Sequence, residues 1–473
     1  MTAPPLTIRN LTATPVTLRL IERYENPSGG QSSSPFGNLT TFVSNITSNV
    51  TNLVSNAPSG APSAPRLAEN AESFARQDVD VRVEPFSTVR TEISATERGP
   101  SEVLRLTLDV EGQQYRIDTP SPKNASQTFT PLVPDPRFQL TGIFLPRESY
   151  LAVLSSANLQ AWMRELRDDL PLAALSIPGT HNSPTYHVAL PSVRCQAVSP
   201  AEQLRNGVRF FDIRVQPESP DDGSKDGLIL VHGVFPVSLT GNKYFRDLIK
   251  DTEQFLQENP SETVIISVKR EGPGTHTDQQ LSLILKNHYA GDENRWFTQP
   301  RVPTLGEARG KIVLMRRFVL DDSLRAEHGG AGWAIDAENW AYNTACDTHG
   351  AVCVQDFCEV LETENIDHKI RVTCEHLSRS AAVSGGLSAE SNNPLYLNFL
   401  SASNFWKVGC WPDKIAAKLN PAVIEHLCTK HHVERDTPGD GTTGVVVCDW
   451  VGDNGNWDLI RAIVAMNSRI LLN

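Results

Sequence analysis

Apolar and polar residues alternate along two stretches near the N-terminus, which predicts β-strands there. Residues 6–24 and much of 79–117 follow a period of two, which places successive side chains on opposite faces of a strand. Between these stretches, residues 26–66 are rich in Ser, Asn, Thr, Gly and Pro, as is typical of a low-complexity insertion. We therefore predict an all-β, sandwich-like domain over residues 1–145 that carries this insertion.

The pattern changes over residues 150–473, where short apolar runs alternate with helical segments such as 242–258, 278–288 and 412–430. Buried strands that alternate with helices predict an α/β fold, a (β/α)8 barrel of the TIM type. The early strands are crowded and residues 216–227 lack a helical pattern, so we expect this barrel to be distorted or incompletely closed. The eight predicted strands are 173–177, 207–213, 228–231, 263–268, 311–315, 352–355, 395–399 and 445–448.

Composition narrows the classes of partner. The chain has 473 residues, 39% of them hydrophobic and 21% charged, as in globular proteins with two domains. Its net charge of −12 argues against nucleic acid as a partner. The N-terminus shows no charged segment followed by a long apolar segment, and no stretch has the length of a membrane span. We expect a monomer that is cytoplasmic or peripheral to a membrane, with secretion as the open alternative.

The eight cysteines all lie from Cys195 onward. None forms a C-x-x-C pair, which argues against zinc. Their even number permits disulfides, but without a signal peptide free thiols are favoured. The sequence therefore predicts neither a metal nor another cofactor.

Polar side chains with the chemistry of a catalytic site follow three of the apolar runs. His181 follows Leu175-Ser176-Ile177-Pro178-Gly179-Thr180, Asp212 and Arg214 end the second run, and His232 ends the third. Two histidines and a fixed cation suit acid–base cleavage of a phosphodiester, since one imidazole removes a proton and the other protonates the leaving oxygen. The guanidinium would hold the phosphate.

With these motifs, residues 165–473 resemble the catalytic domain of phosphatidylinositol-specific phospholipase C, of the bacterial and fungal single-barrel kind. The resemblance does not cover residues 1–150. It implies cleavage of phosphatidylinositol-type lipids to diacylglycerol and inositol 1,2-cyclic phosphate, through attack of the inositol 2-hydroxyl on phosphorus. It also implies that His181 is the general base, His232 the general acid, and Asp449 the carboxylate that orients the base.

The resemblance assigns phosphate binding to Arg214, at a position where calcium-dependent relatives carry a metal-binding carboxylate. A guanidinium there repels a divalent cation, so we expect a metal-independent reaction. Strand alternation places Asp212 on the same face as Arg214. Asn182 departs from the bacterial pattern, which has an aspartate that orients the arginine, and we expect it to hold Arg214 less firmly.

The resemblance also places Lys269, Arg317 and Asp356 at the inositol ring, where an arginine and a carboxylate suit vicinal hydroxyls. Cys358 stands where the bacterial pattern has a tyrosine that stacks beneath the ring, and a thiol cannot provide that apolar face. We expect an unphosphorylated inositol head group and transient contact with a membrane surface. The candidates for a compensating aromatic side chain are Trp333, Trp340, Trp406 and Trp411.

Two alternatives remain open. A metal-dependent phosphodiesterase acting on glycerophosphodiesters or lysolipids would need several carboxylates beside the histidines, but Arg214 takes one such place and no second convergent glutamate is apparent. A catalytically weak lipid-binding barrel protein would account for Asn182 and Cys358. The presence of both histidines argues against it.

Overall fold

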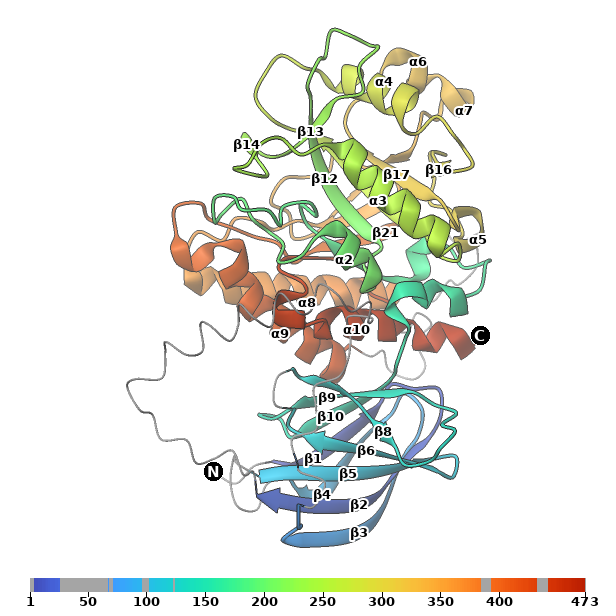
Figure 1. The fold of residues 1–473 in the computed structure, drawn as a ribbon, viewed down its shortest axis with the longest axis vertical. Helices are drawn as coiled ribbons and strands as arrows, with labels where there is room; N and C mark the ends of the chain where they lie inside the picture. The colour runs from blue at the N-terminus through green and yellow to red at the C-terminus, as the bar shows by residue number, and fades with distance from the viewer. Residues whose placement is uncertain are drawn as a thin grey trace. The chain divides into compact units, whose positions relative to one another are not determined.

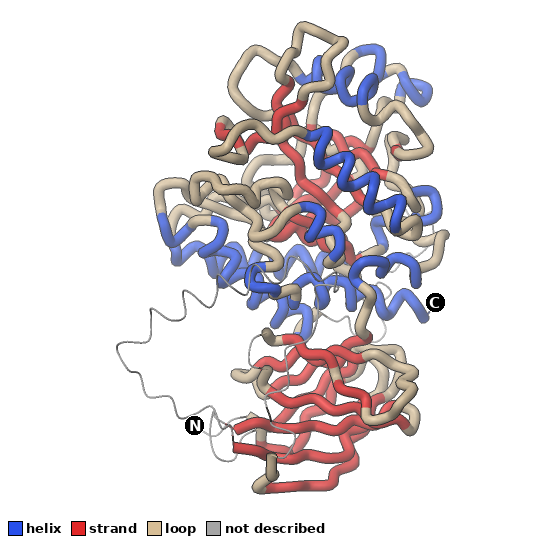
Figure 2. The backbone as a smooth tube through the Cα atoms, viewed as in Figure 1, coloured by secondary structure: helices blue, strands red, loops and turns tan. Residues whose placement is uncertain are grey.

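The computed structural model describes residues 4–25, 67, 71–95, 102–121, 124–383, 393–431 and 441–472. The predicted low-complexity insertion at 26–66 lies outside these residues. The chain divides into two compact units, one made of Met1–Asn10 and Thr14–Val153, the other of Leu11–Ala13 and Leu154–Asn473. The first consists of strands, whereas the second combines strands with helices (Figures 1 and 2).

Two five-stranded sheets form the first unit, in the orders β4-β1-β10-β9-β7 and β3-β2-β5-β6-β8. One core cluster draws buried side chains from both sheets, including Leu6 and Ile8 of one and Leu106 and Leu108 of the other, so the sheets pack as a sandwich. The strands are β1 (Pro5–Asn10), β2 (Val16–Glu25), β3 (Ala75–Val83), β4 (Thr88–Ser94), β5 (Glu102–Val110), β6 (Gln113–Thr119), β7 (Ser126–Thr128), β8 (Thr130–Pro131), β9 (Leu140–Leu145) and β10 (Tyr150–Ser155).

A curled, mostly parallel sheet forms the centre of the second unit, in the order β16-β17-β15-β12-β11-β22-β21-β20-β19. No pairing joins its two ends among the described strands, so the expectation of an incompletely closed barrel is confirmed. The strands are β11 (Ser176–Thr180), β12 (Phe210–Pro217), β15 (Val264–Arg270), β16 (Trp296–Phe297), β17 (Ile312–Arg317), β18 (Ile335–Asp336), β19 (Asp347–His349), β20 (Val352–Gln355), β21 (Leu395–Phe399) and β22 (Gly444–Cys448).

Seven of the eight predicted barrel strands lie on this path of paired strands. The eighth was predicted to run parallel to its neighbours, and that prediction was wrong. Residues 228–231 belong to β13 (Leu228–His232), which pairs antiparallel with β12 and then with β14 (Phe235–Pro236). A parallel return needs a crossover of about a dozen residues or more. The helix-free connection at 218–227 is too short for one, so the chain turns back as a hairpin.

The helices lie around this sheet, and α8 packs against β20 and β21 while α10 packs against β11. The predicted helices at 242–258, 278–288 and 412–430 correspond to α3 (Phe245–Glu258), α4 (Asp278–His288) and α9 (Pro412–Thr429). The other α-helices are α2 (Pro200–Arg205), α5 (Leu305–Ala308), α6 (Asp322–Arg325), α7 (Glu327–Gly330), α8 (Ile366–Val383) and α10 (Asp458–Ala465). The 3-10 helices are η1 (Leu159–Glu165), η2 (Leu172–Ala174), η3 (Thr363–Asn365), η4 (Val408–Cys410), η5 (Asp453–Gly455) and η6 (Met466–Leu472).

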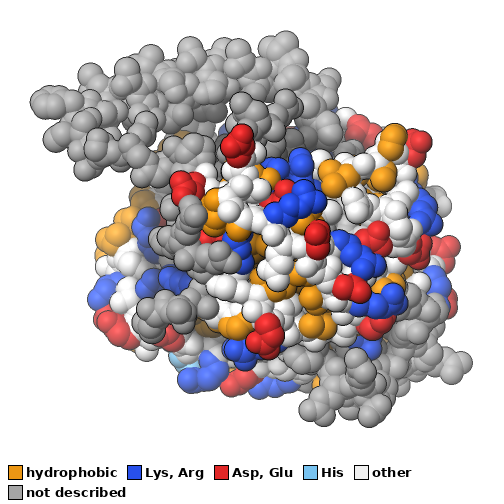
Figure 3. Space-filling view, turned by 90° about the horizontal axis from the view of Figure 1, so that it is seen from below, with side chains coloured by type: hydrophobic (Ala, Val, Ile, Leu, Met, Phe, Trp, Pro, Cys, Tyr) orange, Lys and Arg blue, Asp and Glu red, His pale blue; other side chains and the backbone are white. Residues whose placement is uncertain are grey.

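Charge is mixed on the face shown in Figure 3, where the coloured Lys and Arg side chains are interspersed with Asp and Glu side chains. Among the described residues, none of the helices is both long and apolar enough to cross a membrane.

Candidate active site

Sheet register brings the predicted site residues to one edge of the barrel. In the parallel pairs, Arg214 of β12 lies beside Lys269 of β15, and Lys269 lies beside Arg317 of β17. β11 pairs with β22 along its whole length, so His181 and Asp449, each the residue directly after its strand, are also neighbours. The carboxyl ends of parallel strands therefore present these side chains in one row.

His181 is held between an anion and a cation. Its Nδ1 lies 2.9 Å from Asp449 Oδ1, and its Nε2 lies 3.0 Å from Arg214 Nη2. A guanidinium N–H can only donate, so Nε2 must carry the lone pair and Nδ1 the proton that Asp449 accepts. This contact pattern fixes the tautomer that a base acting through Nε2 requires.

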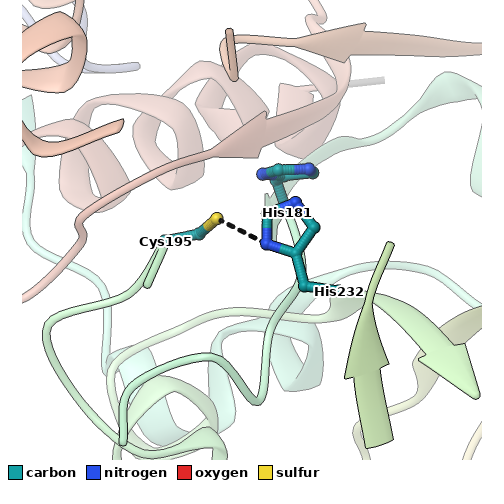
Figure 4. A group of neighbouring side chains, drawn as sticks. All are labelled: His181, Cys195 and His232. Carbon is teal, nitrogen blue, oxygen red and sulfur yellow. Dashed lines mark hydrogen bonds between the residues drawn. The ribbon is translucent and has the colours of Figure 1, made fainter. Parts of the chain in front are cut away.

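His232 comes from the β13–β14 hairpin and faces His181, with the two ring centroids 5.9 Å apart and the planes at 87° (Figure 4). Its Nδ1 lies 2.9 Å from the Val193 carbonyl oxygen and 3.8 Å from Cys195 Sγ. Burial lowers the pKa of His232 to about 3, and Arg214 acts in the same direction. The imidazole is therefore neutral at neutral pH, with Nδ1–H donating to the carbonyl.

Two carboxylates hold Arg214. Asp212 Oδ2 lies 3.4 Å from its Nη2 and Glu271 Oε1 lies 3.3 Å from its Nη1. Burial opposes the charge on Arg214, but Glu271 and Asp212 outweigh it and raise the pKa of the guanidinium. Burial also opposes ionisation of Glu271, yet Arg214 and Lys269 hold the pKa of that carboxyl well below its usual range. The ion pairs thus keep both the Arg214 guanidinium and the Glu271 carboxylate charged.

Glu271 corrects the expectation that no second glutamate converges on the site. It accepts from Lys269 Nζ at 2.8 Å and from the Gly233 backbone N–H at 2.8 Å, in addition to its pair with Arg214. The signal was present in the sequence, because Glu271 follows Lys269 by two positions and period-two alternation places both on one face.

Asn182 has a different place from the one we expected. Its backbone N–H donates to Asp212 Oδ2 at 3.1 Å, in a left-handed conformation with φ of 43°. Its buried side-chain amide has no hydrogen-bond partner among the described residues. Asp212 and Glu271, and not the Asn182 side chain, hold Arg214.

A second group of predicted site residues lies at the ends of β17 and β20. The Arg317 guanidinium lies 3.8 Å from the ring centroid of Trp340, and its Nη1 is 3.6 Å from Asp212 Oδ1. Trp340 Nε1 donates to Asp356 Oδ2 at 3.1 Å. Of the four tryptophans considered, Trp340 is therefore the one that contacts the predicted head-group residues.

Cys358 is half-buried, and its backbone N–H donates to Asn343 Oδ1 at 2.9 Å. Burial raises the pKa of its thiol, so it is a neutral side chain at neutral pH. Nothing in these contacts gives Cys358 a specific role toward a head group.

Unpaired polar atoms gather where a ligand would bind. Buried atoms without a hydrogen-bond partner among the described residues include both amide atoms of Asn182 and Arg214 Nε, while Asp212 Oδ1 and Arg317 Nη1 have only each other at 3.6 Å. Buried polar groups are normally paired, so this concentration fits a site whose substrate completes the network.

A metal fits this site poorly. His181, Cys195 and His232 lie close enough together to be considered as ligands. However, both ring nitrogens of His181 are already engaged, and the Arg214 guanidinium lies 3.0 Å from one of them. A metal ion bound to His181 would therefore have to displace the Arg214 guanidinium.

Residues 169–318 match the family model described as phosphatidylinositol-specific phospholipase C, X domain. The chain is 28% identical to 1-phosphatidylinositol phosphodiesterase of Listeria monocytogenes over 58% of this chain and 77% of that protein. It is 24% identical to 1-phosphatidylinositol phosphodiesterase of Staphylococcus aureus strain Newman over 66% and 95%, and 24% identical to human PI-PLC X domain-containing protein 1 over 64% and 90%.

Solved structures of similar fold include a double mutant of the S. aureus phosphatidylinositol-specific phospholipase C. It matches with a TM-score of 0.52 and 23% identity, over 65% of this chain and 97% of that one. The predicted barrel fold is therefore confirmed. The family match and the relatives identify residues 169–318 of this chain as a phosphatidylinositol-specific phospholipase C X domain.

Proposed function

We propose that this chain cleaves phosphatidylinositol-type lipids to diacylglycerol and inositol 1,2-cyclic phosphate, without a metal ion. The observation that carries the proposal is the alignment of Asp449, His181 and Arg214, which leaves the lone pair of His181 Nε2 facing the phosphate-binding cation. This is the arrangement needed for a hydroxyl to attack a phosphorus atom held by that cation.

In the first step, His181 Nε2 removes the proton of the inositol 2-hydroxyl. Arg214 contacts that nitrogen in the unliganded protein, so the phosphodiester oxygens must draw the guanidinium away before the base can act. Asp449 then stabilises the imidazolium as the proton arrives. Binding of the substrate thereby frees the base that then deprotonates it.

In the second half of the reaction, His232 protonates the glyceryl oxygen as that oxygen leaves phosphorus. Arg214 is among the groups that lower the pKa of His232 in the free protein. A bound phosphodiester carries a negative charge that offsets this cation and favours the protonated imidazole. Substrate binding therefore favours the protonated form of His232, which is the form that can act as the general acid.

The charges of the predicted head-group residues favour an inositol without extra phosphates. Lys269 is paired with Glu271, and Arg317 lies beside Asp212. These pairs leave little uncompensated positive charge for a second phosphate. Trp340 provides an aromatic side chain beside the Arg317 and Asp356 groups, which are suited to ring hydroxyls.

An exposed apolar rim supports contact with a membrane surface. The hairpin after His232 exposes Val234 and Leu239 by 64% and 63%, and the loop after β21 exposes Trp406 by 88%. Phe235 stacks on Phe405 with ring centroids 5.6 Å apart, so the two loops form one rim. Aromatic and aliphatic side chains in such a rim suit a lipid interface.

The test is incubation of the purified chain with phosphatidylinositol vesicles in excess EDTA, followed by phosphorus NMR. We expect a cyclic phosphodiester, and we expect His181→Ala to abolish it. Activity that requires added calcium would contradict metal independence. Vesicle binding without turnover, unchanged in His181→Ala, would instead indicate a binding protein on an enzyme's fold.

A further inference from the structure

A second cluster of metal-binding side chains lies outside the catalytic row. Cys346 precedes β19, Cys353 lies in β20, and His376 lies in α8. Their potential ligand atoms all lie within 4.8 Å of one another. We propose that these three side chains bind a divalent metal ion that favours thiolate ligands, with zinc as the best fit.

The sulfur spacing is that of two ligands on one ion. Cys346 Sγ and Cys353 Sγ are 3.8 Å apart. Two thiolates at about 2.3 Å from a tetrahedral zinc ion would be separated by about 3.8 Å, whereas a disulfide would need about 2.05 Å. The distance therefore matches a shared metal without movement of the hairpin.

His376 supplies an independent reason for a ligand at this place. The residue is fully buried, and neither of its ring nitrogens makes a hydrogen bond of good geometry to a described residue, although the backbone of Cys353 and of Leu397 lies close to the ring. Leaving both atoms unpaired in the interior is costly.

The surroundings fit a site with three protein ligands. Cys346 is exposed and Cys353 is buried, so the cluster opens to solvent on one side, where water can complete a tetrahedron. Arg379 donates to the carbonyl oxygen of Ala345, the residue before Cys346, and pairs with Glu375 at 3.6 Å. Two thiolates would offset the charge of the ion.

The location suggests what the metal does. β19 is the last strand of the open sheet, and α8 packs against β20. An ion shared by Cys346, Cys353 and His376 would join the β19–β20 hairpin to that helix. It would thus secure the end of the sheet that a closed barrel would hold by strand pairing. The absence of a C-x-x-C pair argued against zinc, but the hairpin and the helix bring the ligands together through the fold.

Cobalt(II) titration of the reduced, metal-free full chain tests the proposal, because cobalt in a tetrahedral thiolate site gives a charge-transfer band and intense d–d bands. We expect one cobalt per chain with both features, displaced by zinc. Cys346→Ser replaces one of the two thiols, at an exposed position, so it should lower the charge-transfer intensity and weaken zinc binding by at least about tenfold, as even loss of an outer hydrogen bond can do. His376→Gln should weaken zinc binding to a similar extent, although both thiolates remain.

Two matched controls locate the ion. Cys374→Ser alters a half-buried thiol on the same helix, and Cys195→Ser alters the thiol beside His232. Both variants should keep the cobalt spectrum. Far-ultraviolet circular dichroism should be the same for all variants, so that a lost spectrum reports a lost ligand.

Three results would overturn the proposal. The first is a reduced chain that gives no cobalt–thiolate band. The second is a band that survives in Cys346→Ser but disappears in Cys195→Ser. The third is a reduced chain that binds no metal but that peroxide converts to a Cys346–Cys353 disulfide, two hydrogen atoms lighter by mass spectrometry.

Discussion

Asp449→Asn removes the negative charge that faces His181 but keeps the size of the side chain. In the structure Asp449 is 3% exposed and accepts the Nδ1 proton of His181 at 2.9 Å. An asparagine oxygen can still accept that proton, so the substitution isolates the effect of charge on the imidazolium that forms during the reaction.

The expected loss follows from this contact. A hydrogen bond to a charged group contributes about 1.5–3 kcal/mol, which corresponds to about 10- to 150-fold in rate. The same change in a Ser-His-Asp triad costs about 10⁴-fold, because the histidine also adopts the wrong tautomer. Here Arg214 faces Nε2 in the free protein, so the proton is already on Nδ1 when the substrate binds. We therefore expect the smaller, charge-only loss.

The assay is release of water-soluble inositol phosphate from phosphatidylinositol in mixed micelles. The kcat should fall about 10- to 150-fold with little change in KM, since Asp449 does not touch the lipid. Asp453→Asn makes the same chemical change at an exposed position in the next turn, and should stay within about twofold of the parent.

Either extreme would refute the reasoning. A loss below about threefold, outside the range for a charged hydrogen bond, would mean that His181 is not the base or does not become charged. A loss near 10⁴-fold would mean that Asp449 alone sets the tautomer of His181, and that the contact with Arg214 in the free protein does not determine it.

Four further predictions follow from contacts described above. Glu271→Gln should lower kcat/KM about tenfold or more, because a charged hydrogen bond holding Arg214 is lost, and initial rates against lipid concentration would show it; an unchanged kcat/KM would remove Glu271 from the site. The pKa of His232 is lowered on folding to about 3, so the unfolded chain binds the extra proton first as the pH falls below its ordinary pKa. Stability should therefore decrease between pH 7 and pH 5 by up to about 2 kcal/mol from this residue, and urea unfolding of His232→Gln should show a correspondingly weaker pH dependence. Trp406→Ala should weaken binding to phosphatidylinositol vesicles about tenfold, because burying a large apolar side chain contributes about 1.5 kcal/mol or more; equal sedimentation with vesicles would place the docking surface elsewhere. Glu262→Gln should destabilise the fold by about 3 kcal/mol, because it leaves the fully buried Arg209 without its ion partner at 2.9 Å, and an unchanged denaturation midpoint would contradict this.

Much of the site could be predicted because its residues lie at the ends of apolar runs. Arg214, Lys269 and Arg317 occupy matching register positions on three neighbouring parallel strands, and that placement depends on a local pattern and a general rule for such sheets. The pairing of β11 with β22 likewise follows from the expected order of strands around a barrel.

Other features depend on contacts that no local pattern contains. The direction of β13 depends on a connection too short for a crossover, which its apolar sequence does not reveal. The unpaired amide of Asn182 and the approach of His376 to two cysteines of a hairpin arise only after helix and sheet have packed. Glu271 is intermediate between these cases. Strand alternation was sufficient to place its side chain on the same face as Lys269, but it could not show that Lys269, Gly233 and Arg214 all contact its carboxylate.

The open sheet also has a consequence for self-association. A closed barrel has no exposed strand edge, whereas an open sheet leaves backbone N–H and C=O groups that another chain can pair with. In this protein the sheet ends in β16, which comprises only Trp296–Phe297, and in β19, which comprises Asp347–His349. Strands this short offer an incoming chain few hydrogen bonds, so the gap in the barrel is kept from acting as a template for aggregation.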